Sequence, residues 1–182
     1  YKKEVLAFLD KVSPAVAEIG ACNCVRIVNG KCIGYNTDVV GFEQTLAPFL
    51  KPHHQHALIL GTGGASAAVE WVLRKRGITY QYVSRTASAT TISYEQIDQA
   101  TMESHTLVIN TTPLGMYPNI DACPNLPYQF MNEQHHLFDL VYNPEETQFL
   151  AKGKARGASI QNGWEMLILQ AEESWRIWNE AI

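Results

Sequence analysis

Hydrophobic and polar positions follow two periods along this chain, one typical of strands and the other of helices. Short apolar runs bounded by turn residues predict strands at 57–61, 79–84, 106–110, 136–141 and 158–160. Segments with helical spacing lie between most of them, near 64–76, 93–99 and 145–156. Alternating strands and helices indicate a parallel sheet with helices on both faces.

The first 50 residues show a different order of elements. Two short strands are expected at 22–28 and 32–34, because the turn Asn29-Gly30 between them is a strong hairpin signal. Helices are expected from 5 to 9, after the cap at Ser13, from 39 to 50 and, at the other end of the chain, from 166 to 182.

The stretch Gly61-Thr62-Gly63-Gly64-Ala65-Ser66 joins a predicted strand to a predicted helix. Gly61 allows a sharp turn, and Gly63 lets the backbone approach a pyrophosphate without a Cβ in the way. The first N–H groups of the helix are unpaired and lie at the positive end of its dipole, so they suit a phosphate. A glycine-rich turn without a ligand is the alternative.

The tip of the next strand indicates which dinucleotide would bind. NAD-binding folds place Asp or Glu there to bind the ribose 2′-hydroxyl. Here the tip reads Ser84-Arg85-Thr86, with no carboxylate nearby. A guanidinium between two hydroxyls suits a 2′-phosphate, which predicts NADP, whereas a solvated surface arginine is the commoner role of such a residue.

Composition and charge limit the class of partner. The 182 residues are 46% hydrophobic, enough for one large domain or a domain with an appendage. A net charge of -4 with scattered basic residues gives no face for nucleic acid and no membrane patch, and no apolar run approaches ~20 residues. We therefore expect a small-molecule partner.

No metal site is expected. Cys22 and Cys24 lack the spacing of a zinc site, so free thiols in a reducing cytoplasm are the better interpretation of the cysteines. The remaining candidate ligands are histidines without an acidic ligand at set spacing, and we interpret them as solvated or core residues: His53, His54, His56, His135 and His136.

Eight motifs, in order, carry a resemblance to a known family. They are Tyr1-Lys2-Lys3-Glu4, Gly20-Ala21-Cys22-Asn23, Gly34-Tyr35-Asn36-Thr37-Asp38, the glycine turn Gly61 to Ser66, Ser84-Arg85-Thr86, Asn110-Thr111-Thr112-Pro113-Leu114-Gly115-Met116, Asp139-Leu140-Val141-Tyr142-Asn143-Pro144, and Asn162-Gly163-Trp164-Glu165-Met166-Leu167 with Gln170. In these the chain resembles shikimate dehydrogenase, the NADP-dependent oxidoreductase that reduces 3-dehydroshikimate to shikimate in aromatic amino-acid biosynthesis.

The resemblance implies a role for each matching residue. Lys2 and Asp38 fall at the family's catalytic pair, Lys2 as the acid/base and Asp38 as its orienter. The positions at which the family binds shikimate are Asn23, Tyr142 and Gln170. The positions implied for NADP are Gly61, Thr62, Gly63, Gly64, Ala65, Ser84, Arg85, Thr86, Asn110, Thr111, Leu140 and Gly163.

Taken alone, the local pattern gives the five catalytic and substrate-binding candidates plainer roles. Lys2 would be solvated, and Asp38 would be the N-cap of the helix that follows it. Asn23 would make a structural hydrogen bond, Gln170 would lie at the surface, and Tyr142 would belong to the core.

The family's architecture predicts three parts: residues 1–37 as a remnant of an α/β substrate-binding domain, 38–160 as an NADP-binding Rossmann domain, and 161–182 as a helix returning toward the remnant. Most of the family's substrate domain has no counterpart here, so we expect Lys2 to be poorly held near a fraying end. The run 86–90 lacks the second basic residue that the family often has, which weakens the expected NADP preference.

Two alternatives follow. The chain could be an isolated NADP-binding fragment without turnover, or a quinate/shikimate dehydrogenase that uses NAD. Without the rest of the substrate domain, apolar residues at Val5, Leu6, Phe8 and Leu9 would be uncovered, which predicts either self-association, as in a homodimer, or disorder of residues 1 to about 35.

Overall fold

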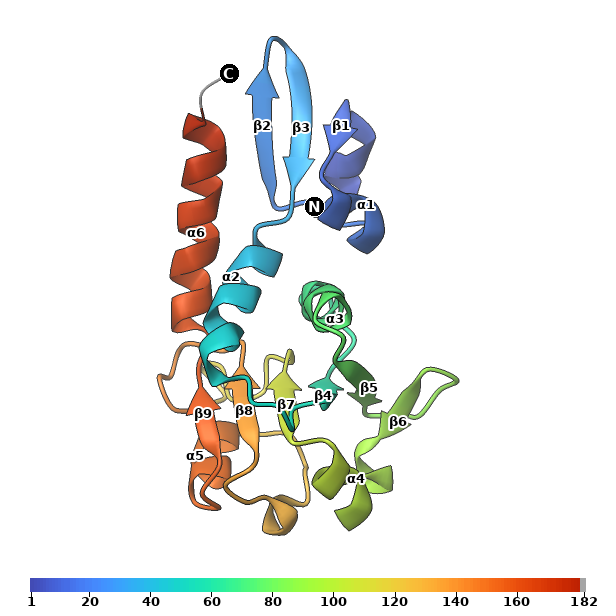
Figure 1. Ribbon diagram of the computed structural model, residues 1–182, viewed down its shortest axis with the longest axis vertical. Coiled ribbons are helices and arrows are strands. Elements are labelled where there is room, and N and C mark those ends of the chain that lie inside the picture. Colours follow the sequence, from blue (N-terminus) through green and yellow to red (C-terminus); the bar gives the residue numbers. More distant parts are fainter. Residues whose placement is uncertain (181–182) are drawn as a thin grey trace.

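The computed structural model describes residues 1–180 (Figure 1). Its larger part is a sheet of six parallel strands in the order β6-β5-β4-β7-β8-β9. The strands are β4 (His56–Leu60), β5 (Thr79–Ser84), β6 (Thr91–Ser93), β7 (Leu107–Asn110), β8 (His136–Asp139) and β9 (Ser159–Gln161). The chain runs outward from β4 to β6, returns to β7 beside β4, and then runs outward in the other direction. This doubly wound order confirms the expected fold class and places a switch point between β4 and β7.

Helices cover both faces of this sheet, as expected. They are α2 (Asp38–Leu46), α3 (Ser66–Lys75), α4 (Gln99–Ser104) and α5 (Gln148–Lys154), with short 3-10 turns η2 (Ala47–Phe49), η3 (Tyr94–Gln96) and η4 (Tyr128–Phe130). Ile59 packs in the core beneath α2 and α3, whereas Leu58 and Leu60 pack in the core on the opposite face. A strand buried on both faces reads as a continuous apolar run, which is why β4 was visible in the sequence.

The N-terminal part forms a smaller sheet, drawn above the larger one in Figure 1. It contains η1 (Glu4–Phe8), β1 (Lys11–Val12), α1 (Pro14–Ile19), β2 (Cys24–Val28) and β3 (Lys31–Tyr35). The expected hairpin of β2 and β3 is present, with Asn29 at φ 51° and Gly30 at φ 76°. Both turn residues are left-handed, as the turn of such a hairpin requires.

Helix α6 (Trp164–Asn179) connects the two sheets. It starts after β9, packs along α2, and reaches β2, where Trp178 Nε1 donates to the carbonyl oxygen of Val25 at 3.0 Å. Gly41 of α2 makes the close crossing possible, because a Cβ there would lie 2.6 Å from the carbonyl oxygen of Met166. Positions 181 and 182, which the predicted helix included, lie outside the described residues.

Several expected bounds were wrong. The helix expected over 93–99 is instead η3 followed by α4, and the helix expected from 5 to 9 is the 3-10 turn η1. The strand expected over 136–141 ends at Asp139. Strands β1 and β6 were not predicted, because each is a short strand at a sheet edge without an apolar run.

The apolar residues near the start of the chain are only partly uncovered. Phe8 is 76% exposed and Ile27 on β2 is 71% exposed, whereas Val5, Leu6 and Leu9 are half-buried. Residues 1–35 form defined elements instead of the disorder that was the alternative, and self-association stays a prediction. Within residues 1–180 no helix has the length and apolar character needed to cross a membrane.

Candidate active site

A groove runs across the carboxyl ends of the central strands. It consists of two adjoining cavities of about 530 and 520 Å³ that share Gly63 and the segment 111–113. The first cavity extends to Arg85 at the tip of β5, and the second extends to Tyr142 beyond the end of β8. Grooves at this edge, beside the switch point, are where open α/β sheets bind their ligands.

The glycine turn offers a row of free donors to this groove. Within the described residues, the backbone N–H groups of Thr62, Gly63, Gly64 and Ala65 donate no hydrogen bond to the protein. Ser66 closes the turn instead, since its N–H and its hydroxyl both donate to the carbonyl oxygen of Gly63, at 3.1 and 2.6 Å. Successive free N–H groups at a helix N-terminus form an anion site.

The glycines of this turn differ in what requires them. Gly61 has φ 96°, and a Cβ there would lie 2.7 Å from Cγ2 of Thr112, so both its backbone and its surroundings demand glycine. A Cβ on Gly63 or Gly64 would have no atom of the described residues within 4 Å. The space beside these two residues is therefore open and belongs to the groove.

Arg85 is the cation at one end of the groove. Among residues 1–180 no carboxylate pairs with its guanidinium, so the charge is available to a ligand. Tyr94, which sequence reasoning missed, lines the same cavity; burial raises its pKa and the charge of Arg85 opposes that rise. The Ser84 hydroxyl donates to the carbonyl oxygen of Thr86 and so shapes the loop.

Contrary to expectation, Asn110 does not line the groove. Its side chain is buried, its Nδ2 donates to Oδ1 of Asp139 at 2.9 Å, and its Oδ1 accepts from the Thr112 hydroxyl at 2.6 Å. Oδ2 of Asp139 in turn accepts from the Thr147 hydroxyl at 2.6 Å. Burial raises the pKa of Asp139 to about 6 despite these hydrogen bonds. We therefore revise the role of Asn110: it holds the ends of β7 and β8 together, and Thr111 lines the groove.

The end of β8 forms the other side of the groove. Leu140 lies against Gly163, where a Cβ would come within 2.2 Å of the Leu140 carbonyl oxygen. Tyr142 is 45% exposed, and its ring centroid lies 6.0 Å from that of Trp164. Because β8 ends at Asp139, Tyr142 is a groove residue and not the core residue that an apolar strand would have made it.

Lys2 and the glycine turn line one cavity. This third cavity, of about 660 Å³, lies between the N-terminal segment and the start of α3. Lys2 Nζ lies 2.6 Å from Oδ2 of Asp38, and its carbonyl oxygen accepts from the N–H of Cys22 at 2.8 Å. The expectation that Lys2 would be poorly held was wrong, since both its backbone and its side chain are anchored.

Asp38 is fixed from its other side by Asn23. Nδ2 of Asn23 donates to Oδ1 of Asp38 at 2.9 Å and to the Thr37 hydroxyl at 3.1 Å, while Oδ1 of Asn23 accepts from the N–H of Thr37 at 2.8 Å. Thr37 occupies the N-cap position and Asp38 is the first residue of α2. The plainer role of Asp38 as an N-cap was therefore wrong, and its carboxylate is used by Lys2 and Asn23.

Helix α6 brings Gln170 to the same place. Oε1 of Gln170 lies 3.5 Å from the Thr37 hydroxyl, which also pairs with the Ser174 hydroxyl at 3.0 Å. Sequence reasoning missed Thr37 and Ser174 as site residues, although Ser174 lies one helical turn after Gln170 and so shares its face. The fold thus joins Lys2, Asn23, Asp38 and Gln170, whereas Tyr142 lies at the nearby groove.

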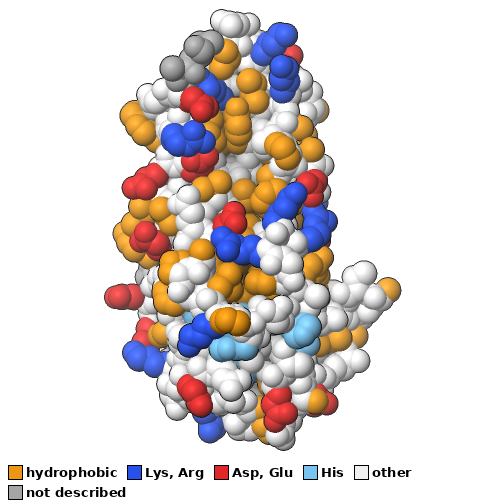
Figure 2. All heavy atoms as spheres, viewed as in Figure 1, with side chains coloured by type: hydrophobic (Ala, Val, Ile, Leu, Met, Phe, Trp, Pro, Cys, Tyr) orange, Lys and Arg blue, Asp and Glu red, His pale blue; other side chains and the backbone are white. Residues whose placement is uncertain are grey.

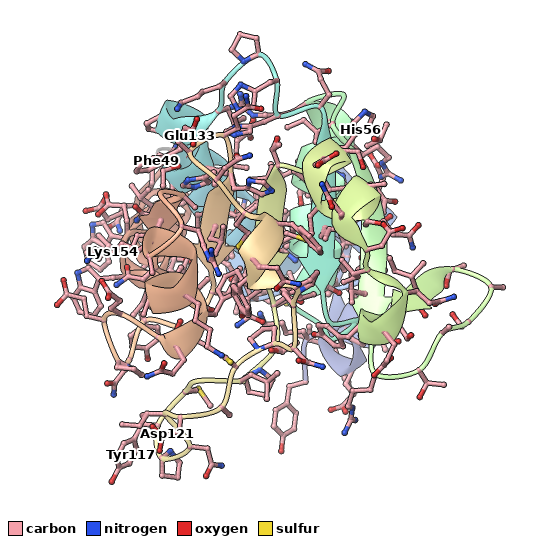
Figure 3. The ribbon with its side chains drawn as sticks, turned by 90° about the horizontal axis from the view of Figure 1, so that it is seen from below. Phe49, His56, Tyr117, Asp121, Glu133 and Lys154 are labelled. Carbon is pink, nitrogen blue, oxygen red and sulfur yellow. The ribbon has the colours of Figure 1, made fainter. Side chains whose placement is uncertain are left out.

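The histidines lie away from this site. His54, His135 and His136 belong to the amino-terminal edge of the large sheet, and Figure 2 shows histidines on the lower part of the molecule. In Figure 3, Phe49 and Glu133 lie near this edge, whereas Tyr117 and Asp121 project with their loop on the opposite side. Across the described part of the chain, no group of three metal-binding side chains is found.

Comparison with known proteins gives the same name repeatedly, although no family model matches. Shikimate dehydrogenase (NADP(+)) of Desulforamulus reducens is 35% identical over 98% of this chain and 68% of its own length. The enzyme of that name from Clostridium beijerinckii is 36% identical over 99% of this chain and 69% of its own length. The crystal structure of shikimate 5-dehydrogenase from Thermus thermophilus, in complex with NADP(H) and shikimate, is 34% identical with a TM-score of 0.85, covering all of this chain and 70% of that one.

Proposed function

Because the chain belongs to the shikimate dehydrogenase family, we propose that its groove binds NADP, that shikimate binds where Lys2, Asp38 and Gln170 meet, and that Lys2 and Asp38 move the proton of the reaction. The chain is an NADP-dependent oxidoreductase that interconverts 3-dehydroshikimate and shikimate. The observation that carries the proposal is that Lys2 and the glycine turn line one cavity.

The residues of the groove fit the cofactor. Four free N–H groups at the glycine turn suit its pyrophosphate, and the unpaired Arg85 suits its 2′-phosphate. No carboxylate occupies the tip of β5, where a fold specific for NAD would hold one. The nicotinamide end would lie in the second cavity, between Leu140 and the loop at Met116.

Bound NADP supplies or accepts the hydride, and the protein provides orientation and the path of the proton. In the direction of reduction, the Lys2 ammonium donates a proton to the substrate carbonyl oxygen; in oxidation, neutral Lys2 takes the proton from the hydroxyl. Asp38 orients Nζ of Lys2 through the 2.6 Å contact, and Asn23 fixes Asp38 in turn.

Gln170 and Tyr142 are assigned to the substrate. Nε2 of Gln170 donates to the carbonyl oxygen of Leu167 at 2.9 Å, which leaves its second hydrogen for a substrate hydroxyl. The hydroxyl of Tyr142 is available at the groove. Asn23 already uses both amide hydrogens, so its contact with substrate requires that it release Thr37. We keep the three-part division at residues 37 and 160 as part of this proposal.

The experiment that tests this function is a cofactor comparison. We expect the chain to reduce NADP+ when shikimate is added, with a higher kcat/KM than for NAD+, because Arg85 can pair only with the 2′-phosphate of NADP. Arg85→Gln should lower the ratio of kcat/KM for NADP+ to kcat/KM for NAD+ by about tenfold or more. Reduction of either cofactor at a rate independent of shikimate, or a ratio that Arg85→Gln leaves unchanged, would contradict the assignment.

A further inference from the structure

The cofactor brings more negative charge than Arg85 can balance. NADP carries a pyrophosphate in addition to its 2′-phosphate, and a charged phosphate is held best by a donor that is itself charged. The basic side chains lining the three cavities are Arg85, Lys2 and Lys3. Arg85 lies at the strand tip, and Lys2 is engaged by Asp38, which leaves Lys3.

Lys3 shares a cavity with the glycine turn. It lines the third cavity together with Gly63, Gly64 and Ser66, and its side chain is exposed. No carboxylate among residues 1–180 forms an ion pair with it. The backbone at Lys3 is fixed, since the carbonyl oxygen of Lys2 accepts from Cys22 and that of Lys3 accepts from the N–H of Leu6 at 3.3 Å.

We propose that Lys3 binds the pyrophosphate of the cofactor across the cavity, adding a charged donor to the four backbone N–H groups of the glycine turn. This inference rests on the proposed binding of NADP. It gives the neighbouring lysines separate tasks, with Lys2 acting on the substrate and Lys3 on the cofactor. Because the two are adjacent, a cofactor held by Lys3 also ties the segment carrying Lys2 to the nucleotide-binding part.

The 2′-phosphate is the competing target for Lys3. Thr90 and Thr91, near the tip of β5, line the same cavity as Lys3. The 2′-phosphate expected at that tip is therefore a second group that the Lys3 ammonium could bind. The glycine turn contributes four of the lining residues, Thr62, Gly63, Gly64 and Ser66, and all of the free N–H groups, which favours the pyrophosphate. NADH carries the pyrophosphate without the 2′-phosphate, and it therefore separates the two targets.

The test is a titration of the intact chain with NADPH and with NADH. Lys3→Gln should weaken the binding of both cofactors by the same factor, about five- to tenfold, because one charged donor to the shared pyrophosphate is lost. Lys3→Arg should restore both affinities. Lys11→Gln is the matched control: Lys11 is an exposed lysine on β1 that lines none of the three cavities, and its variant should bind both cofactors as the unmodified chain does.

The other results overturn the inference in distinguishable ways. Weaker binding of NADPH alone assigns Lys3 to the 2′-phosphate, and unchanged binding of both cofactors removes Lys3 from the site. If the unmodified chain binds neither cofactor, the proposed function itself fails. The unfolding temperature of each variant, which should not change for a substitution at an exposed side chain, shows that any loss of affinity arises in the site.

Discussion

Within the glycine turn, Gly61 is required for the folded backbone and Gly63 for the approach of a ligand. In Gly61→Ala the alanine must adopt the positive φ of the turn, and its methyl group contacts Thr112. In Gly63→Ala the methyl group lies in the open groove. We therefore expect Gly61→Ala to lower the free energy of unfolding by about 1–3 kcal/mol. Gly63→Ala should leave stability nearly unchanged and weaken NADPH binding at least tenfold, since the pyrophosphate must approach the backbone there.

Chemical denaturation and an NADPH titration of the two variants check this pair of expectations. Each variant is the control for the other, because both add one methyl group to the same turn. A Gly63→Ala protein that binds NADPH normally would mean that the open space beside Gly63 is not the phosphate site. A Gly61→Ala protein of unchanged stability would remove the structural requirement for that glycine.

At the scale of elements, the strands that could be predicted from the sequence are those marked by a pattern of neighbouring residues. Strands β4, β5, β7, β8 and β9 and the β2–β3 hairpin were predictable, because short runs with apolar residues and the Asn-Gly turn are signals within a few residues. Strands β1 and β6 were missed because each has only two or three residues and no apolar run, so that only the pairing with its neighbour defines it.

The site was predictable only in part, for a related reason. Motifs gave Lys2 and Asp38, but the network that holds them depends on α6 crossing α2, where Thr37 meets Gln170 and Ser174. These residues are more than 130 positions apart, and no local signal reports that contact. In the same way, the motif predicted Asn110 as a groove residue. Only the pairing of β7 with β8 shows that the Asn110 side chain turns inward, toward Asp139.

At the scale of the whole molecule, the buried histidines should make stability depend on pH. Burial lowers the pKa of His136 to about 4, with His54 and Lys51 nearby adding to the effect, and burial also lowers the pKa values of His54 and His135. A histidine held neutral stabilises the fold above its unfolded pKa of about 6.5, and that contribution is lost as the pH falls toward the folded value. For His136 the loss between pH 7 and pH 5 is about 2 kcal/mol.

Asp139 acts in the opposite direction over part of this window. Its pKa is raised to about 6, so protonation favours the fold as the pH falls through 6, and offsets about 1 kcal/mol of the loss.

The measurement of this pH dependence is urea denaturation at pH 7 and pH 5. We expect His136→Phe, which keeps a ring to stack on Phe49, to lose much less stability between these pH values than the unmodified chain. The same change at His53, an exposed residue, is the control, and equal pH dependence in all three proteins would contradict this explanation.

The proposed function requires that this chain completes a hydride transfer and that Lys2 moves the proton of that reaction. The direct measurement is the rate of NADPH formation from NADP+ and shikimate by the 182-residue protein and by its Lys2→Ala variant, at cofactor concentrations that saturate both. We predict turnover in the unmodified chain and a loss of about 10²- to 10⁴-fold in kcat for Lys2→Ala, with NADPH affinity retained. Equal turnover in the two proteins would contradict the role of Lys2. Absence of turnover in an unmodified chain that binds NADPH would contradict the claim as well, and would favour the alternative of a cofactor-binding fragment.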